Sequence, residues 1–346
     1  MNIVYITEVN GYLKKESKNL VLYKGKEKIT EIKTDDLSQL IIVGNIQVST
    51  QALSFLFKRG IDLVFLSLSG KFRGRLTSDS SKNIELRKKQ FKIFEDKNFI
   101  LESSRNIVRA KILNQLYFLK RAQFKRKSEK IKKAIFEIKK LLLTLEKAKS
   151  IDSIRGYEGR ASALYFGVFG ESIVKENIVF KKRTRRPPED EVNTLLSFGY
   201  TLLLNTISGL VEMTSLDKYL GVFHTIDYGK PSLVLDLMEE WRPLIVDILT
   251  VSLINQGIIS KKDFFYPEKD KPPYPELIED FKELPVVLKR EGLRKFITYY
   301  EKRLRETLYD KRVDRVIPYK DIIEYQVKRM VKSVETSAPY EGFFMA

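Results

Sequence analysis

Residues 131–145 read IKKAIFEIKKLLLTL. Apolar side chains recur in this stretch at spacings of three and four residues, and lysines occupy several of the positions between them. This period is typical of a helix that buries one stripe of side chains and leaves the remainder in water. The apolar positions are Ile131, Ala134, Ile135, Ile138, Leu141, Leu142 and Leu145.

The helical period continues on both sides of this stretch and predicts that residues 84–346 are all-α. Candidate helices cover residues 84–97, 99–126, 128–148, 154–170, 189–212, 231–256, 289–309 and 320–334. Pro243 should kink or split the sixth of them, because proline lacks an N–H and clashes with the preceding turn. The proline-rich residues 266–275 are predicted to form a loop, and the tail from about residue 335 is expected to be mobile.

Residues 1–83 follow a different pattern, that of short strands separated by glycines. One amphipathic stretch, residues 49–59, begins with serine and threonine and is followed by Gly60, so it predicts a single helix among the strands. The predicted fold class is α+β, with a mainly-β N-terminal domain over 1–83 and a larger all-α C-terminal domain over 84–346. Runs typical of strands include residues 3–9, 19–24, 39–43 and 61–68.

Composition excludes several classes of protein. The 346 residues include no cysteine, which rules out disulfides, cysteine-based zinc fingers and thiolate nucleophiles, and the single histidine rules out HExxH motifs. The formal net charge of +18 indicates a polyanionic partner. The first residues do not resemble a secretion signal, and no run approaches the roughly 18 apolar residues of a membrane span, so a cytoplasmic, soluble protein without a membrane partner is expected.

Two basic stretches are candidates for phosphate binding. Residues 87–149 contain 20 Lys and Arg against 6 Asp and Glu, although such a run is equally typical of a solvated helix face. The second stretch, KKRTRR at 181–186, is followed by Pro187 and Pro188 and a predicted helix start, where backbone N–H groups also favour phosphate. No nucleotide-binding loop is present in the sequence, since Gly229 and Lys230 lack the upstream glycine of a P-loop.

Glu158 lies in an unusual context for a carboxylate. In RGYEGRASALYF (155–166) it shares a predicted helix face with Ala161, Ser162 and Tyr165, and small neighbours leave space for a ligand or another backbone. The alternative is a surface ion pair between Glu158 and Arg155 or Arg160.

A second group of polar residues follows. His224 stands in GVFHT (221–225), and Asp236, Glu239 and Glu240 are spaced so that all three project from one face of an otherwise apolar helix. That face must meet cations or water, because buried like charges are costly unless they are paired or bound to a metal. The alternatives are exposure to solvent, neutralisation by Arg242 and Lys230, and a purely structural histidine. If Glu158, His224 and Glu239 converge, they form a mixed oxygen and nitrogen site suited to Mg²⁺ or Mn²⁺, which would act on phosphate esters.

Four motifs carry a resemblance to a known family. They are RGYEGRAS (155–162), RRPPEDEVNTLLSFGY (185–200), GVFH (221–224) and GKPSLVLDLMEEWRP (229–243). In their order and separations the sequence resembles CRISPR-associated protein one, the endonuclease and integrase of spacer acquisition. The resemblance covers essentially the whole chain and implies an N-terminal β domain that dimerises and a helical catalytic domain that requires Mg²⁺ or Mn²⁺.

The resemblance also implies roles for particular residues. Glu158, His224 and Glu239 would be the metal ligands, with Asp236 a further catalytic residue; some relatives have Asp in place of Glu239, so the division of roles between these two carboxylates stays open. Asn193 would lie near the site or serve helix packing. The implied nucleic-acid contacts are Arg183, Arg185, Arg186, Lys230 and Tyr165.

The predicted function is therefore a homodimeric, metal-dependent DNA endonuclease and integrase that inserts short DNA fragments as new spacers into the CRISPR repeat array by direct transesterification. The resemblance implies CRISPR-associated protein two as a partner. The alternative is a non-catalytic basic scaffold that binds DNA or RNA, in which the acidic residues form salt bridges. A Ser-His-Asp hydrolase ranks below both, because the sequence has no GxSxG elbow for His224 to serve.

Overall fold

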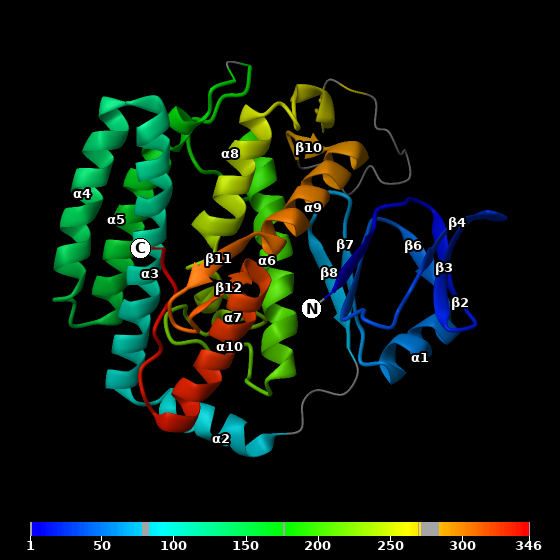
Figure 1. The fold of residues 1–346 in the computed structure, drawn as a ribbon, viewed down its shortest axis with the longest axis horizontal. Helices are drawn as coiled ribbons and strands as arrows, with labels where there is room; N and C mark the ends of the chain where they lie inside the picture. Colours follow the sequence, from blue (N-terminus) through cyan, green and yellow to red (C-terminus); the bar gives the residue numbers. More distant parts are fainter. Residues whose placement is uncertain (1, 78–82, 176, 269, 271–283, 346) are drawn as a thin grey trace.

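The structure is a computed structural model that describes residues 2–77, 83–175, 177–268, 270 and 284–345. Two four-stranded sheets make up the N-terminal region, and the chain is mostly helical from residue 84 onward (Figure 1). The predicted order, strands first and helices afterwards, is confirmed.

One sheet forms the boundary with the helices. Its strand order is β1 (Ile3–Ile6), β5 (Gln39–Val43), β7 (Asp62–Leu66) and β8 (Phe72–Leu76); β1, β5 and β7 are parallel and β8 is antiparallel to β7. All of β5 is buried: Leu40 and Ile42 join the core of the N-terminal region, whereas Ile41 and Val43 join the core of the helices. A strand covered on both faces tends to be apolar throughout, and four of the five residues of β5 are, Gln39 being the exception.

The second sheet is peripheral. Its strand order is β4 (Glu27–Ile32), β3 (Asn19–Lys24), β2 (Gly11–Glu16) and β6 (Ile46–Val48). Beside it lies α1 (Thr50–Lys58), which begins where Ser49 Oγ accepts a hydrogen bond from the N–H of Ala52 at 3.2 Å and ends before Gly60, whose φ is +65°. The helix predicted over 49–59 is confirmed.

The helices after residue 83 match the predicted ones within a few residues at most ends. Polar side chains at Asp96, Ser128, Ser150 and Asp190 accept hydrogen bonds from the first turns of four of them. The helices are α2 (Ile84–Ile93), α3 (Lys97–Arg126), α4 (Glu129–Leu145), α5 (Ile151–Phe169), α6 (Glu191–Met213), α7 (Ser232–Met238), α8 (Ile248–Asn255), α9 (Arg290–Arg305) and α10 (Tyr319–Thr336).

Long helices α3, α4 and α5 stand side by side at the edge of the molecule farthest from the sheets (Figure 1). The stripe at 131–145 accounts for this packing: Ile131, Ala134, Ile138 and Leu145 are buried and face α3 and α5. Among the described residues, α6 is the one helix long and apolar enough to cross a membrane, and 78% of its most apolar stretch is buried inside the protein. Its apolar surface is therefore covered by the rest of the protein.

Proline at 243 does interrupt the sixth predicted helix. Helix α7 ends at Met238, residues Arg242–Asp247 form a short π-helix, and α8 follows. Of the proline-rich stretch 266–275, residues 269 and 271–275 lie outside the described residues, and the others have turn or irregular backbone.

The expectation that residues 84–346 are all-α is wrong in two places. β9 (Phe264–Phe265) pairs with β10 (Val287–Leu288), and β11 (Thr307–Asp310) pairs with β12 (Arg315–Pro318). The second pair shortens the helix predicted over 289–309, because the chain turns extended at Glu306 to enter the hairpin. The boundary predicted at residue 83 lies beside residues 78–82, which are not described, so the division into two domains stays a prediction.

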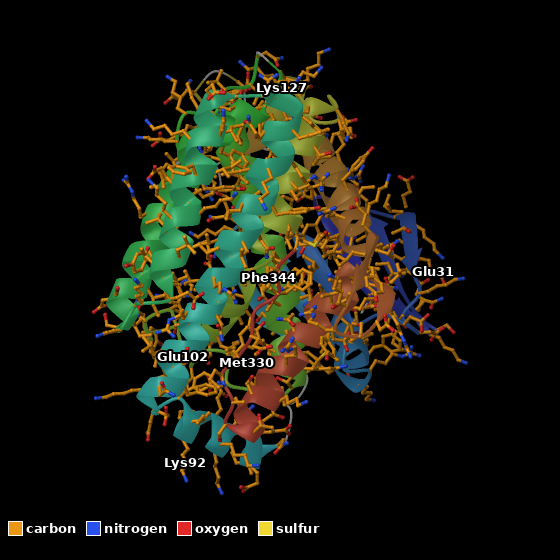
Figure 2. All side chains as sticks on the ribbon, turned by 60° about the vertical axis from the view of Figure 1, so that its left-hand side comes forward. Glu31, Lys92, Glu102, Lys127, Met330 and Phe344 are labelled. Carbon is orange, nitrogen blue, oxygen red and sulfur yellow. The ribbon has the colours of Figure 1, made fainter. Side chains whose placement is uncertain are left out.

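The C-terminal segment packs against the helices, so the expectation of a mobile tail is wrong for residues 338–345. Asn106 and Asn114 of α3 donate amide hydrogen bonds of 2.9 Å to the carbonyls of Tyr340 and Phe343. Tyr340 is fully buried, and the Phe343 ring stacks on Trp241 with centroids 4.8 Å apart. The segment runs from the end of α10 back along α3, where Phe344 is labelled (Figures 1 and 2). The residues that this C-terminal segment contacts are remote in sequence. Its position at the end of the chain therefore did not predict whether it is packed or mobile.

We predict that Phe343→Ala lowers the free energy of unfolding by about 3–5 kcal/mol, because it empties a buried aromatic site. Phe344→Ala is the matched control: Phe344 is 41% exposed, so its loss should change stability by no more than about 0.5 kcal/mol. Urea unfolding followed by circular dichroism measures both variants. Equal losses would show that the segment does not pack as described.

Candidate metal centre

Glu158 lies near the middle of α5 and faces α3. Its Oε1 accepts a hydrogen bond from Ser162 Oγ, one turn along the helix, at 2.8 Å. The same oxygen accepts a hydrogen bond from the ammonium of Lys111 on α3. Glu158 is thus paired with Lys111. In the part of the chain that the structure describes, the surface ion pair with Arg155 or Arg160, the alternative considered from the sequence, does not form.

Asp236 holds the loop that carries His224. Its carboxylate, fully buried, accepts hydrogen bonds from the backbone N–H groups of Val222 (2.6 Å), Phe223 (3.0 Å) and His224 (2.9 Å). Oδ1 also lies 2.6 Å from His224 Nδ1. A carboxylate at Nδ1 favours the proton on that nitrogen and leaves the lone pair of Nε2 available, the usual arrangement for a metal-binding histidine.

Helices α3 and α5 hold the same loop from the other side. Ser104 Oγ donates to the carbonyl of Val222 at 3.0 Å, and Arg155 Nη2 donates to the carbonyl of Phe223 at 2.9 Å. Gly221 is needed for the close approach, since a Cβ there would lie 2.6 Å from Asp236 Oδ2. His224 is thereby fixed beside the helix that carries Glu158.

Glu239 follows the end of α7 and lies between the cations of Lys111 and Arg242, with the His224 ring beside it. Its Oε1 is 3.7 Å from His224 Nε2 and 3.1 Å from Arg242 Nε, and its Oε2 is 2.6 Å from Lys111 Nζ. Burial alone would raise the pKa of this carboxyl, but the neighbouring cations, Arg242 foremost and then Lys111, outweigh burial and lower the pKa to about 2. Glu239 is therefore a buried but ionised carboxylate.

The structure thus brings Glu158, His224 and Glu239 to one place from α5, a loop and the end of α7. Among the described residues, no three His, Asp or Glu side chains are close enough to hold an ion as they stand. The Lys111 ammonium lies between the two carboxylates instead. Two carboxylates with a cation between them, and an imidazole with Nε2 available, are a donor set that fits Mg²⁺ or Mn²⁺.

The expectation that Asp236, Glu239 and Glu240 share one face is wrong, because α7 ends at Met238 and the two glutamates diverge. Glu240 turns away from the centre and accepts hydrogen bonds from the N–H of Phe343 (2.6 Å) and the hydroxyl of Tyr340 (2.9 Å). Burial raises the pKa of Glu240 to about 7 despite these bonds. This carboxyl holds the C-terminal segment.

The basic residues at 183–186 differ in exposure. Arg185 and Arg186 are exposed, whereas Arg183 turns inward, donating to Asn193 Oδ1 at 2.8 Å and to Ser197 Oγ at 3.1 Å. Asn193, fully buried, also accepts from the N–H of Thr184 at 3.0 Å. Asn193 thus shapes the basic segment, and the two exposed arginines remain available to a phosphate.

Tyr165 and Lys230 were both expected to touch nucleic acid, and the structure separates them. Tyr165 is fully buried and donates its hydroxyl hydrogen bond to Asp247 at 2.8 Å, as Tyr200 does at 2.6 Å, so Tyr165 does not reach the surface. Burial raises the pKa of Asp247 to about 6 even with these donors. Lys230 is partly exposed beside the His224 loop, in an ion pair with Asp227 at 2.9 Å.

Lys111 is the residue that sequence reasoning missed. It was counted only as one of many basic residues between 87 and 149. A sharper signal was present: Lys111 falls in the apolar stripe of its own helix, between the buried residues Val108 and Ile112. A lysine in such a stripe is rarely buried without an acidic partner.

We predict that Gly221→Ala lowers the free energy of unfolding by about 1–3 kcal/mol, the range for overpacking, because its methyl group collides with Asp236. Gly159→Ala on α5 is the control: a Cβ there has no neighbour within 4 Å, and alanine favours the helix by up to about 1 kcal/mol. Thermal unfolding of both variants measures the difference. A Gly221→Ala protein as stable as Gly159→Ala would contradict the described loop.

Comparison with known proteins places the chain in a family. The model of the family "CRISPR associated protein Cas1" matches residues 4–302. The curated relative CRISPR-associated endonuclease Cas1 3 of Thermus thermophilus is 32% identical over 99% of this chain and 97% of its own length.

Solved structures agree with the fold. The Cas1 protein TM1797 of Thermotoga maritima has a TM-score of 0.79 and 26% identity, covering 100% of this chain and 99% of that one. A casposase bound to its integration product has a TM-score of 0.84 at 23% identity, covering 99% and 93%. A chain of a Cas6-RT-Cas1–Cas2 complex has a TM-score of 0.83 at 23% identity, covering 100% of this chain and 36% of that one. The chain belongs to the Cas1 family, the CRISPR-associated endonucleases and integrases of spacer acquisition.

Proposed function

We propose that this Cas1 protein cuts and joins DNA at a centre where Glu158, His224 and Glu239 hold Mg²⁺ or Mn²⁺. The observation that carries the proposal is the convergence of two carboxylates and an available imidazole nitrogen from three separate elements. When bound, such an ion polarises a phosphoryl oxygen and stabilises the charge that develops at phosphorus.

The surrounding residues orient the ligands. Asp236 fixes the ring and tautomer of His224, and its oxygens are engaged by backbone N–H groups, so we assign it a positioning role and Glu239 the ligand role. Arg242 lies beside Glu239 and stabilises its ionised form. The positioning role of Asp236 and the ligand role of Glu239 both follow from which of their carboxylate oxygens face the centre.

Phosphate contacts come from the exposed cations nearby. We assign Arg185, Arg186 and Lys230 to the DNA backbone, with Arg183 supporting the loop from inside.

In strand joining, the 3′-hydroxyl of a fragment attacks a repeat phosphodiester, a new phosphorus–oxygen bond forms, and the bond to the repeat's own 3′ oxygen breaks. Water in place of that hydroxyl gives cleavage.

We also propose how the protein assembles, from its membership of the Cas1 family. The chain acts in the cytoplasm as a homodimer joined through its N-terminal sheets and works with Cas2, which accompanies Cas1 in the Cas6-RT-Cas1–Cas2 complex. A non-catalytic scaffold would also have its carboxylates in ion pairs, as Lys111 and Arg242 provide here. Membership of a family of endonucleases favours the enzyme.

We predict that Glu158→Ala, His224→Ala and Glu239→Ala each reduce Mn²⁺-dependent strand transfer by more than about 100-fold, since the loss of a ligand should exceed the 10–100-fold effect of residues beside ligands. DNA binding should survive, because it depends on the Lys and Arg surface. The assay joins a fluorescent fragment to a supercoiled repeat plasmid in Mn²⁺ and then with chelator.

The control for these variants is Glu171→Ala, which removes a carboxylate paired with Lys130 on the surface. It should retain wild-type strand transfer. Product at near wild-type rate from folded His224→Ala would contradict the metal centre and favour the scaffold.

We predict that replacing Arg185 and Arg186 together by Ala weakens binding to every DNA sequence and lowers the log–log salt slope by about 1–2, at ~0.9 per phosphate contact. Lys311→Ala with Arg315→Ala is the control, since it removes the same charge from two exposed positions of the β11–β12 hairpin, away from the N-terminal sheets. Equal effects of the two double variants on the slope would assign the change to net charge alone.

A further inference from the structure

Lys111 is held in an unusual setting for a lysine. Its side chain is 8% exposed, and Nζ contacts Glu158 on α5 and Glu239 after α7, the latter at 2.6 Å. The helix behind it is fixed in place, because Asn114, one turn on, donates hydrogen bonds to the carbonyls of Glu240 (2.8 Å) and Phe343 (2.9 Å). The backbone is thus anchored, and the flexible four-carbon stem is the part that can move.

This ammonium joins the two carboxylates electrostatically. Arg242 lies at ion-pair distance from Glu239 alone, so among the described residues Lys111 is the one cation that contacts both Glu158 and Glu239. Without it, two negative groups would face each other across a largely buried space, which is unfavourable.

We propose that Lys111 is a built-in competitor of the divalent ion: its ammonium holds Glu158 and Glu239 together before the ion binds and must leave when it does. The inference rests on the proposed function of these glutamates as metal ligands. An ammonium and a divalent ion need the same carboxylate oxygens, and two cations in one small site repel each other. Lys111 therefore weakens ion binding while it stabilises the ion-free protein.

The displaced ammonium needs another anion, because a buried unpaired charge is costly. A DNA phosphate is the anion that the reaction brings to this centre. Lys111 would then couple the two binding events, so that the ion and the phosphate each bind more tightly in the presence of the other. In this role Lys111 is a positioning residue that also selects for the complete complex.

The experiment compares wild type with Lys111→Met, which keeps the length of the stem and removes the charge. Melting temperatures are measured in chelator and in saturating Mn²⁺, and Mn²⁺ affinity is measured by electron paramagnetic resonance without DNA. Lys295→Met is the control, because Lys295 Nζ also forms an ion pair of 2.6 Å with a buried carboxylate, that of Asp263, although its own side chain is 37% exposed; this ion pair does not involve the residues of the centre. Lys111→Arg retains the charge.

We expect Lys111→Met to melt below wild type in chelator and to recover the difference in Mn²⁺, with Mn²⁺ bound about 10-fold more tightly, on the order expected for removing one repelling charge about 4 Å away. Lys295→Met should lose the same stability in both conditions, and Lys111→Arg should not gain Mn²⁺ affinity. A purely structural lysine would resemble Lys295. An equal loss in both conditions, unchanged Mn²⁺ affinity, or a Lys111→Met protein that stays unfolded in saturating Mn²⁺ overturns the proposal.

Failure of the metal centre is distinguishable from failure of this inference. If wild type binds no Mn²⁺, or if Glu158→Ala and Glu239→Ala bind it as well as wild type does, the metal centre itself is wrong and the competitor role falls with it. If those two variants lose Mn²⁺ binding and Lys111→Met behaves as wild type, the metal centre stands and the competitor role of Lys111 is wrong.

Discussion

The neutralisation of the Glu239 carboxylate is the constraint on which the centre depends. A carboxylate that is 5% exposed and still ionised must be matched by positive charge, since leaving it unpaired costs several kcal/mol. That charge comes from Lys111 on α3 and Arg242 in the π-helix, with His224 nearby in a loop. The packing of these elements is therefore governed by charge as well as by apolar contacts.

Residues around the centre hold these charged groups in place. Asp236 fixes the His224 loop through three backbone N–H groups, and Gly221 leaves room for its carboxylate. The C-terminal segment forms hydrogen bonds with Glu240, the residue after Glu239, and with Asn114, which lies one turn from Lys111. The end of the chain thus connects the helix that supplies the cation to the segment that supplies the carboxylate.

Much of the fold could be predicted from local patterns. The stripe at 131–145, the helix between Ser49 and Gly60 and the interruption at Pro243 each depend on neighbouring residues, and each is confirmed. The buried C-terminal segment and the β11–β12 hairpin could not be predicted in this way, because their partners are distant in sequence or compete with a helical pattern.

Some residues of the centre could be predicted from the sequence and others could not. Motifs drew attention to Glu158, His224 and Glu239, which do converge, but spacing could not show that Tyr165 is buried against Asp247 or that Glu240 turns away. Lys111 escaped notice because its role depends on two carboxylates that lie 47 and 128 residues farther along the chain. A buried cation is recognisable only after its acidic partners have been placed in space.

A divalent ion in the space where Glu158, His224 and Glu239 meet is what the proposed chemistry requires. Anomalous diffraction from a crystal soaked in Mn²⁺ tests it most directly. We expect a peak about 2.0–2.3 Å from carboxylate oxygens of both glutamates and from His224 Nε2, with the Lys111 ammonium moved away from them. A well-ordered crystal at saturating Mn²⁺ that shows Lys111 still bridging the two carboxylates, with no peak between them, would contradict it.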